Sequence, residues 1–232
     1  MRRRQVSELM DDPAITEADF AAILDDIARL NRLTFAHRPL LGFLDRLASR
    51  TGARAMSVLD VGAGGGDALR AAARWGRARG VATDLWGLDR SPWAVRQARR
   101  LGTPGGWITA DLFALEEERR FDAVVCCLFA HHLDDDTLVS FLRWLPRHTT
   151  GRWLILDLHR HRLPWTAVWL GTRLLRMHPI VCHDGPVSIA RAFSRADWEG
   201  LIRRSGVQAS LRWVAPFRWA VEGPGGGGAV GE

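Results

Sequence analysis

The chain has 232 residues, of which 47% are hydrophobic and 25% are charged, so it is long enough for one buried core and is neither disordered nor fibrous. Its formal net charge is +6, but all 32 basic residues are arginines spread along the chain, so we expect no nucleic-acid partner. The sequence contains no lysine and no tyrosine, which excludes a Schiff base, a lysine base and a phenolic acid from any mechanism.

Apolar stretches and cysteines in the sequence indicate the cellular compartment of the protein. The longest apolar stretch, Leu163 to Leu175, is too short to span a bilayer and contains Arg173. No secretory signal is visible at the N-terminus, and Cys126, Cys127 and Cys182 lack metal-ligand spacing. We therefore expect a cytoplasmic protein without stable membrane insertion, either a monomer or a homodimer.

The N-terminal quarter is predicted to be helical. Thr16 and Asp19 mark the start of an amphipathic helix that continues to Leu33, and a second helix is expected over Pro39–Ser49. Both precede the first strand, so residues 1–54 are interpreted as a helical lid.

From Ala55 onward strands alternate with helices, which predicts a doubly wound α/β fold with a mostly parallel, seven-stranded sheet. An insertion at 160–193 contains a helical lid after the fifth strand, and the last two strands form an antiparallel hairpin. The domain is expected to span 55–222, with a disordered glycine-rich tail at 223–232. Strands are expected at 56–61, 84–89, 107–110, 121–129, 153–158, 208–214 and 217–221.

A glycine loop directly follows the first predicted strand, in the pattern Asp60-x-Gly62-x-Gly64-x-Gly66. Asp89 ends the second strand and Asp111 follows the third, so the three carboxylates are expected along one rim of the sheet. There they can accept hydrogen bonds from ribose hydroxyls and an adenine amino group and face a cationic amino-acid end. The open alternatives are a tight strand-to-helix turn for the glycines and an N-cap role for Asp111.

These residues resemble those of the class I S-adenosylmethionine-dependent methyltransferases, over roughly residues 56–221. The resemblance implies that S-adenosylmethionine is the cofactor, with its methionine part at the glycine loop, its ribose at the acid after strand two and its adenine at the acid after strand three. It assigns to cofactor binding the residues Asp60, Gly62, Ala63, Gly64, Asp89, Arg90, Asp111, Leu112 and Leu128. An NAD site fits less well, because Asp67 occupies the last glycine position of that motif.

The fourth strand is followed by adjacent histidines, His131 and His132. Imidazole is suited to act as a base at neutral pH, so either side chain is a candidate catalytic residue for removing a proton from a hydroxyl group. Similar histidine pairs occur in methyltransferases that act on quinones and polyketides. The alternative, that both rings are structural, stays open.

The lid helix carries Trp165 and Trp169, and His159 and His183 flank it; these four side chains are candidates for contacting substrate. A helix packed as extra core or against a partner or membrane surface is the alternative. Cation-dependent methyltransferases are expected to have an acidic ligand at strand four, where this chain has Cys127 or Leu128, so no bound metal is expected.

The sequence thus predicts an S-adenosylmethionine-dependent O-methyltransferase for a small hydroxylated aromatic, quinone-like or polyketide metabolite. C- or N-methyl transfer to a similar molecule is an open alternative. A methyltransferase-like protein that uses the cofactor only as structure is another.

Overall fold

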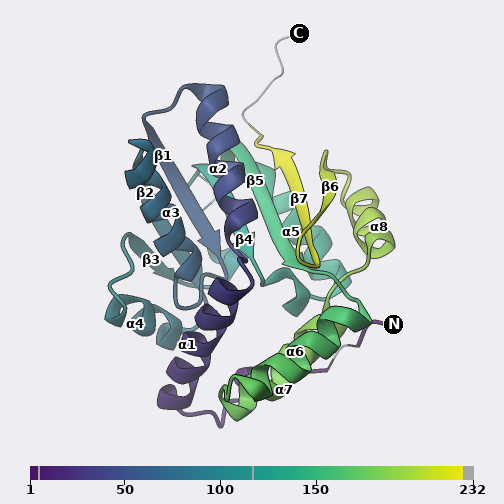
Figure 1. The fold of residues 1–232 in the computed structure, drawn as a ribbon. Coiled ribbons are helices and arrows are strands. Elements are labelled where there is room, and N and C mark those ends of the chain that lie inside the picture. Colours follow the sequence, from purple (N-terminus) through teal and green to yellow (C-terminus); the bar gives the residue numbers. More distant parts are fainter. Residues whose placement is uncertain (5, 117, 227–232) are drawn as a thin grey trace.

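A computed structural model describes residues 1–4, 6–116 and 118–226, whose centre is a seven-stranded sheet (Figure 1). The strand order is β3-β2-β1-β4-β5-β7-β6. Strands β1 to β5 run parallel to one another, and β7 runs antiparallel to both β5 and β6. The strands are β1 (Ala55–Val61), β2 (Ala82–Asp89), β3 (Gly106–Thr109), β4 (Phe121–Cys127), β5 (Thr149–Leu158), β6 (Ser210–Val214) and β7 (Arg218–Pro224).

Helices cover both faces of this sheet, because its central strands are apolar on both sides. Helices α2 and α3 pack on one face, and α5 and α8 pack on the other. The α-helices are α1 (Glu17–Leu33), α2 (Arg38–Thr51), α3 (Asp67–Arg79), α4 (Pro92–Arg100), α5 (Asp135–Arg147), α6 (Arg162–Leu174), α7 (Pro179–Arg191) and α8 (Arg195–Ser205). Three short 3-10 helices are η1 (Leu9–Asp11), η2 (Leu112–Ala114) and η3 (Ala130–His132).

Helices α1, α6 and α7 lie together beyond the carboxyl ends of the parallel strands (Figure 1). Phe20 and Leu24 of α1 pack with Ala94 of α4, whereas Ile23 on the adjoining side of α1 packs with Val181 of α7. The N-terminal helix and the insertion therefore form one helical layer over the strand ends.

Most predicted elements are present, and their boundaries have identifiable causes. Thr16 caps α1 by accepting a hydrogen bond from the Asp19 N–H at 3.1 Å, and Ser194 and Asp197 form a reciprocal capping box at the start of α8. Strand β4 ends at Cys127, two residues earlier than predicted, because Leu128 has a φ of +58°.

Two features of the C-terminal half differ from the prediction. The insertion contains two helices, α6 and α7, where the sequence indicated only one over residues 163–177. Strand β7 continues to Pro224 instead of ending at 221, since Gly223 and Pro224 pair with Trp153 and Arg152 of β5. Gly225 and Gly226 of the expected disordered tail donate to the carbonyls of Gly151 and Pro146, and residues 227–232 lie outside the described residues.

Among the residues that the structure describes, no helix combines the length and the apolarity needed to cross a membrane.

Candidate active site

A cavity of about 400 Å³ lies between the ends of the parallel strands and the helical layer above them. Its floor includes the ends of β1, β2 and β4 and the segment after β3, and its cover includes α1, η1 and α7. All nine residues predicted to bind cofactor line this cavity, and so do His131 and His132. The predicted convergence of these residues at one rim of the sheet is therefore confirmed, because they line a single cavity.

The glycine loop after β1 turns sharply because three of its residues adopt left-handed backbone conformations. Gly62, Gly64 and Gly66 have φ values of +70°, +50° and +73°, which side chains with a Cβ rarely adopt. At Gly62 a Cβ would also lie 2.4 Å from the Phe129 ring. The loop is thus a cradle that brings backbone to the cavity, with α3 starting directly behind it.

Asp60 lies at the base of this cradle, is 2% exposed and lines the cavity. Its Oδ1 atom is buried and has no hydrogen-bond partner among the described residues. Burial, together with the charges of Asp67 and Asp89, raises the pKa of Asp60 well above its ordinary value. A buried carboxyl oxygen without a donor is a position that a cationic or hydrogen-bonding ligand group would satisfy.

Asp89 connects the two loops of the rim. Its Oδ2 accepts the Gly64 N–H and its Oδ1 accepts the Ser91 N–H, both at 2.8 Å. Burial raises the pKa of Asp89, and the two backbone donors act against this rise. Each oxygen retains a second lone pair, so the carboxylate can still accept hydrogen bonds from a ligand's hydroxyls.

Asp111 combines both roles that the sequence left open. It is the N-cap of η2, where it accepts the Phe113 N–H at 2.9 Å, and it lines the cavity beside the buried Leu112. Arg90 lies at the mouth of the cavity, where its guanidinium is 3.2 Å from Asp11. The capping role of Asp111 is thus confirmed, and it does not exclude a contact with ligand.

His131 is held by the carboxylate of Asp157 at the end of β5. The Asp157 side chain is 0% exposed, and its Oδ1 lies 2.7 Å from His131 Nδ1 while its Oδ2 accepts the His131 backbone N–H at 2.7 Å. Because a carboxylate only accepts, the imidazole proton resides on Nδ1 and Nε2 is left as an acceptor. This arrangement fixes both the orientation and the tautomer of the ring.

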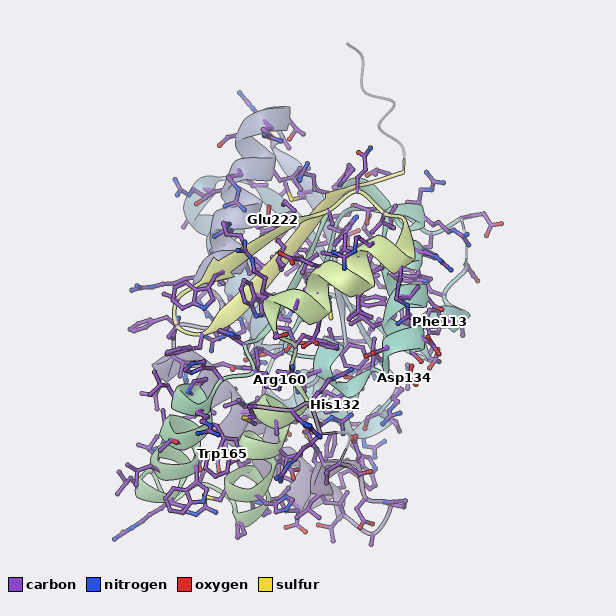
Figure 2. The ribbon with its side chains drawn as sticks, turned by 90° about the vertical axis from the view of Figure 1, so that its right-hand side faces the viewer. Phe113, His132, Asp134, Arg160, Trp165 and Glu222 are labelled. Carbon is purple, nitrogen blue, oxygen red and sulfur yellow. The ribbon has the colours of Figure 1, made fainter. Side chains whose placement is uncertain are left out.

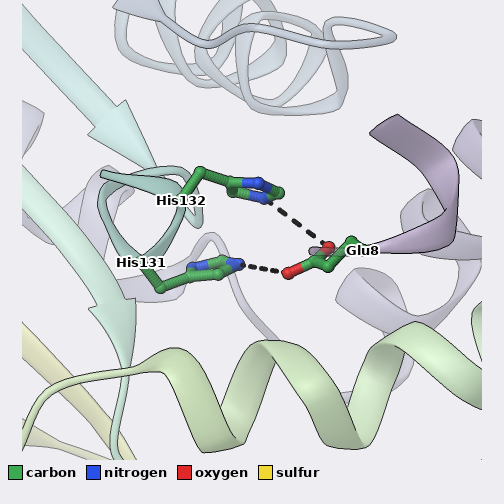
Figure 3. A group of neighbouring side chains, drawn as sticks. All are labelled: Glu8, His131 and His132. Carbon is green, nitrogen blue, oxygen red and sulfur yellow. Dashed lines mark ion pairs between the residues drawn. The ribbon is translucent and has the colours of Figure 1, made fainter. Parts of the chain in front are cut away.

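Glu8 faces both imidazoles from the opposite side (Figure 3). Its carboxylate oxygens lie 3.8 Å from His131 Nε2 and 3.7 Å from His132 Nε2, beyond hydrogen-bond distance. Burial raises the pKa of Glu8. A carboxylate oxygen of Glu8 and one ring nitrogen each of His131 and His132 lie within 4.8 Å of one another. In the described part of the chain, these three side chains form the group that could hold a metal ion.

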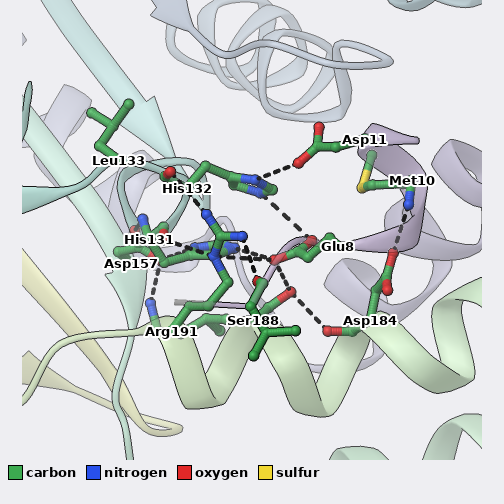
Figure 4. A network of polar contacts seen from close by, with 12 residues as sticks. Glu8, Met10, Asp11, His131, His132, Leu133, Asp157, Asp184, Ser188 and Arg191 are labelled. Carbon is green, nitrogen blue, oxygen red and sulfur yellow. Dashed lines mark hydrogen bonds and ion pairs between the residues drawn. The ribbon is translucent and has the colours of Figure 1, made fainter. Parts of the chain in front are cut away.

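The N-terminal segment that carries Glu8 is fixed to α7 by polar contacts (Figure 4). Asp184 accepts the backbone N–H groups of Leu9 and Met10 at 2.9 Å, and Ser188 donates to Glu8 at 2.9 Å. Arg191 donates to the backbone carbonyls of Val6, His131 and His132 at 2.8–3.2 Å. The N-terminal segment and α7 thereby cover the cavity at the histidine pair.

The four residues predicted to contact substrate lie outside the cavity lining. Trp165 and Trp169 are on the outer side of α6, 36% and 41% exposed, and Figure 2 shows Trp165 well away from His132. His159 packs against Trp219, with ring centroids 5.0 Å apart, and His183 is half exposed beside Asp184. The lid contributes to the cavity mainly through α7, because α6 packs on the outside of α7.

Several cavity residues were not singled out in the sequence analysis. Apolar side chains of α1 and α7 also line the cavity, together with Thr34, His37 and Arg218. Asn31 and His37 both contact Asp67, at 2.8 and 2.9 Å, which anchors the end of α1 to the glycine loop. Helical periodicity predicted the apolar face of α1 but not the surface that it covers.

A parallel sheet of this order, with a glycine cradle and three acids at one rim, is the architecture of the class I methyltransferases. Residues 58–150 match the family described as a methyltransferase domain. Among curated proteins, none matches the sequence closely enough to count as a relative.

Solved structures of methyltransferases share the fold at low sequence identity. The plantazolicin methyltransferase BpumL in complex with SAH, the demethylated cofactor, gives a TM-score of 0.64 at 14% identity over 90% of this chain and 96% of its own. Magnesium protoporphyrin IX methyltransferase from Synechocystis PCC 6803, also with bound SAH, gives 0.54 at 15% identity over 82% and 84%. An O-methyltransferase family protein from Burkholderia thailandensis gives 0.58 at 18% identity over 88% of this chain.

The chain spans 59% of the Burkholderia protein and 60% of a similar one from Nostoc punctiforme. The matched domain covers the central part of the chain, and the fold is that of solved S-adenosylmethionine-dependent methyltransferases. The orphaned Asp60 oxygen, the glycine cradle and the Asp89 carboxylate fit this cofactor in chemistry and in order along the rim.

Proposed function

We propose that the protein transfers a methyl group from S-adenosylmethionine to a hydroxyl oxygen of a small aromatic, quinone-like or polyketide metabolite. The observation that carries this proposal is the buried His131–Asp157 pair in the wall of the cavity. The cavity volume of about 400 Å³ falls in the range of small-molecule sites. Its lining by apolar residues of α1 and α7 favours an acceptor with an aromatic or acyl body.

The cofactor, when bound, supplies an electrophilic methyl group on a sulfonium sulfur. Asp60, Asp89 and the backbone of the glycine loop would hold it, with Leu112 and Asp111 at its adenine end. The helical layer over the strand ends excludes bulk water and aligns the acceptor, which is the main source of rate enhancement for an in-line transfer.

His131 has the features of a general base for this reaction. With the proton on Nδ1 held by Asp157, Nε2 is available to accept the proton of the acceptor hydroxyl. Asp157 then stabilises the imidazolium that forms, in the manner of the buried carboxylate of a catalytic triad.

His132 and its neighbours would position this base. The His132 ring lies 4.5 Å from that of His131 and stacks on Phe129 at 6.0 Å, and its Nδ1 is 3.5 Å from Asp11. The same contacts leave His132 as the second candidate for the base.

The test is incubation of the purified protein with methyl-labelled S-adenosylmethionine and a panel of phenols, hydroxyquinones and aromatic amines. We expect demethylated cofactor and label attached to oxygen, located by NMR of the product. His131→Gln should lose at least 100-fold in turnover, whereas His161→Gln, which removes a cap of α6 outside the cavity lining, should not. Label on carbon or nitrogen, or wild-type turnover when both His131 and His132 are replaced, would contradict the proposal.

A further inference from the structure

The wall of the cavity at the start of β7 contains a buried arginine, Arg218. Arg218 is 5% exposed and lines the cavity. Among the described residues, no carboxylate oxygen lies within 4.0 Å of its guanidinium. Buried charges in proteins are paired or satisfied by several hydrogen bonds, because an isolated one is costly to desolvate.

The hydrogen bonds of Arg218 leave part of its donor capacity free. Nη2 donates to Thr34 Oγ1 at 2.8 Å, and Nη1 donates to the carbonyls of Pro216 and Thr34 at 3.2 and 3.4 Å. Nε is buried and has no hydrogen-bond partner within the described part of the chain. A guanidinium has five N–H groups, so the edge formed by Nε and Nη2 still has donors for two parallel hydrogen bonds, the geometry that matches a carboxylate.

The acidic groups near Arg218 are already engaged. Burial lowers the pKa of Arg218 to about 10, with Asp157 as the carboxylate acting against this shift. Asp157 is committed to His131 and to two backbone N–H groups. The guanidinium therefore remains charged at neutral pH, and the cavity that it lines is mostly apolar.

The strand order separates Arg218 from the cofactor cradle. Arg218 pairs with Leu158 at the end of β5, and β7 is three strands away from β1, whose end carries the glycine loop. Three interstrand spacings amount to about 14 Å. Residues predicted to hold the cofactor follow β1, β2, β3 and β4, whereas the backbone of Arg218 lies beyond β5 and its guanidinium contacts Thr34 at the end of α1.

We propose that Arg218 binds an acidic group of the methyl acceptor, so that the substrate is a hydroxylated aromatic carrying a carboxylate. This inference rests on the proposed function for the identity of the acceptor. Strands β4 and β7 are two spacings apart, about 10 Å, and His131 follows β4 while Arg218 starts β7. An aromatic ring with a hydroxyl at one end and a carboxylate at the other can bridge the two side chains, which would orient the hydroxyl toward His131.

The probes are benzoate, 4-hydroxybenzoate and 6-hydroxy-2-naphthoate, each paired with its neutral amide. Binding is measured by calorimetry and by thermal shift, with and without the demethylated cofactor. We expect at least one carboxylate to bind the wild type about ten-fold more tightly than its amide, as two charge-assisted hydrogen bonds would give. Arg218→Gln should remove this preference and Arg218→Lys should keep part of it.

Arg212→Gln is the matched control, because Arg212 is on the adjacent strand β6, is half exposed and pairs with Glu222 outside the cavity lining. It should behave as the wild type. The proposal is wrong if no carboxylate binds, if amides bind equally well, or if Arg218→Gln retains the preference. A comparison of the wild type with Arg218→Lys still decides the matter should the glutamine variant not fold.

Affinity for the demethylated cofactor separates this inference from the proposed function. We expect the cofactor affinity of Arg218→Gln to equal that of the wild type. A loss of about ten-fold or more would assign the arginine to the cofactor's own carboxylate and overturn the inference. If the wild type binds no cofactor, the proposed function fails, while Arg218-dependent binding of the carboxylate probes can still be observed.

Discussion

Replacing Gly62 by alanine tests whether the cradle depends on a missing side chain, and the structure allows the cost to be divided. The left-handed φ of +70° costs about 1–2 kcal/mol for a residue with a Cβ. The added Cβ would lie 2.4 Å from the Phe129 ring, within the core beneath His132, and such overpacking costs about 1–3 kcal/mol. We therefore expect Gly62→Ala to lower the free energy of unfolding by about 2–5 kcal/mol.

Two matched substitutions isolate the clash from the strain. Gly80→Ala, at the end of α3, has a φ of +66° and no atom within 4 Å of the added Cβ; Gly64→Ala has a φ of +50° and meets only Leu24 at 3.5 Å. Both should cost only the strain, about 1–2 kcal/mol. Urea unfolding measures the free energies, and calorimetry measures affinity for the demethylated cofactor. If Gly62→Ala costs no more than Gly80→Ala, the Phe129 ring yields freely and the reasoning is refuted.

Three further predictions concern the polar groups of the site. Asp157→Asn should lower turnover by about 100-fold or more, because the amide no longer fixes the His131 tautomer. Asp122→Asn, at the amino ends of the parallel strands, should leave initial rates unchanged. Equal rates for the two variants would contradict the role of Asp157. Burial raises the pKa of Asp67, but contacts with His37 and Asn31 outweigh it and bring the pKa to about 2. The wild type should thus be about 2 kcal/mol more stable than Asp67→Asn above pH ~4 and lose this advantage as pH falls from about 4 to 2; urea titrations with a pH-independent difference would refute this. Dialysis against EDTA should leave turnover intact, and loss of activity with stoichiometric metal in elemental analysis would show that Glu8 and the histidines are metal ligands instead.

The residues proposed to hold the cofactor could be placed at one rim from the sequence because they follow consecutive strands. Asp60, Asp89 and Asp111 each come directly after an apolar run, and parallel strands bring such positions to one rim regardless of loop details. The same logic placed His131 and His132 there.

The acceptor side could not be predicted in this way, because it depends on long-range packing. Glu8 reaches the histidines through a segment held by Asp184 and Arg191, more than 170 residues away in sequence, and no local pattern signals such a contact. Helix α6 is apolar on several sides, so its periodicity cannot tell whether Trp165 faces the cavity or solvent. Helix α7 is not evident from the sequence because Pro186 lies inside it.

We infer that one rim of the sheet binds both the nucleoside part and the amino-acid part of a single methyl donor. Titration of the purified wild type with the demethylated cofactor in a calorimeter tests it without knowledge of the acceptor. We expect saturable binding of one molecule per chain, strongly weakened in Asp89→Ala. Absence of binding heat together with an unchanged melting temperature at saturating ligand would contradict the account.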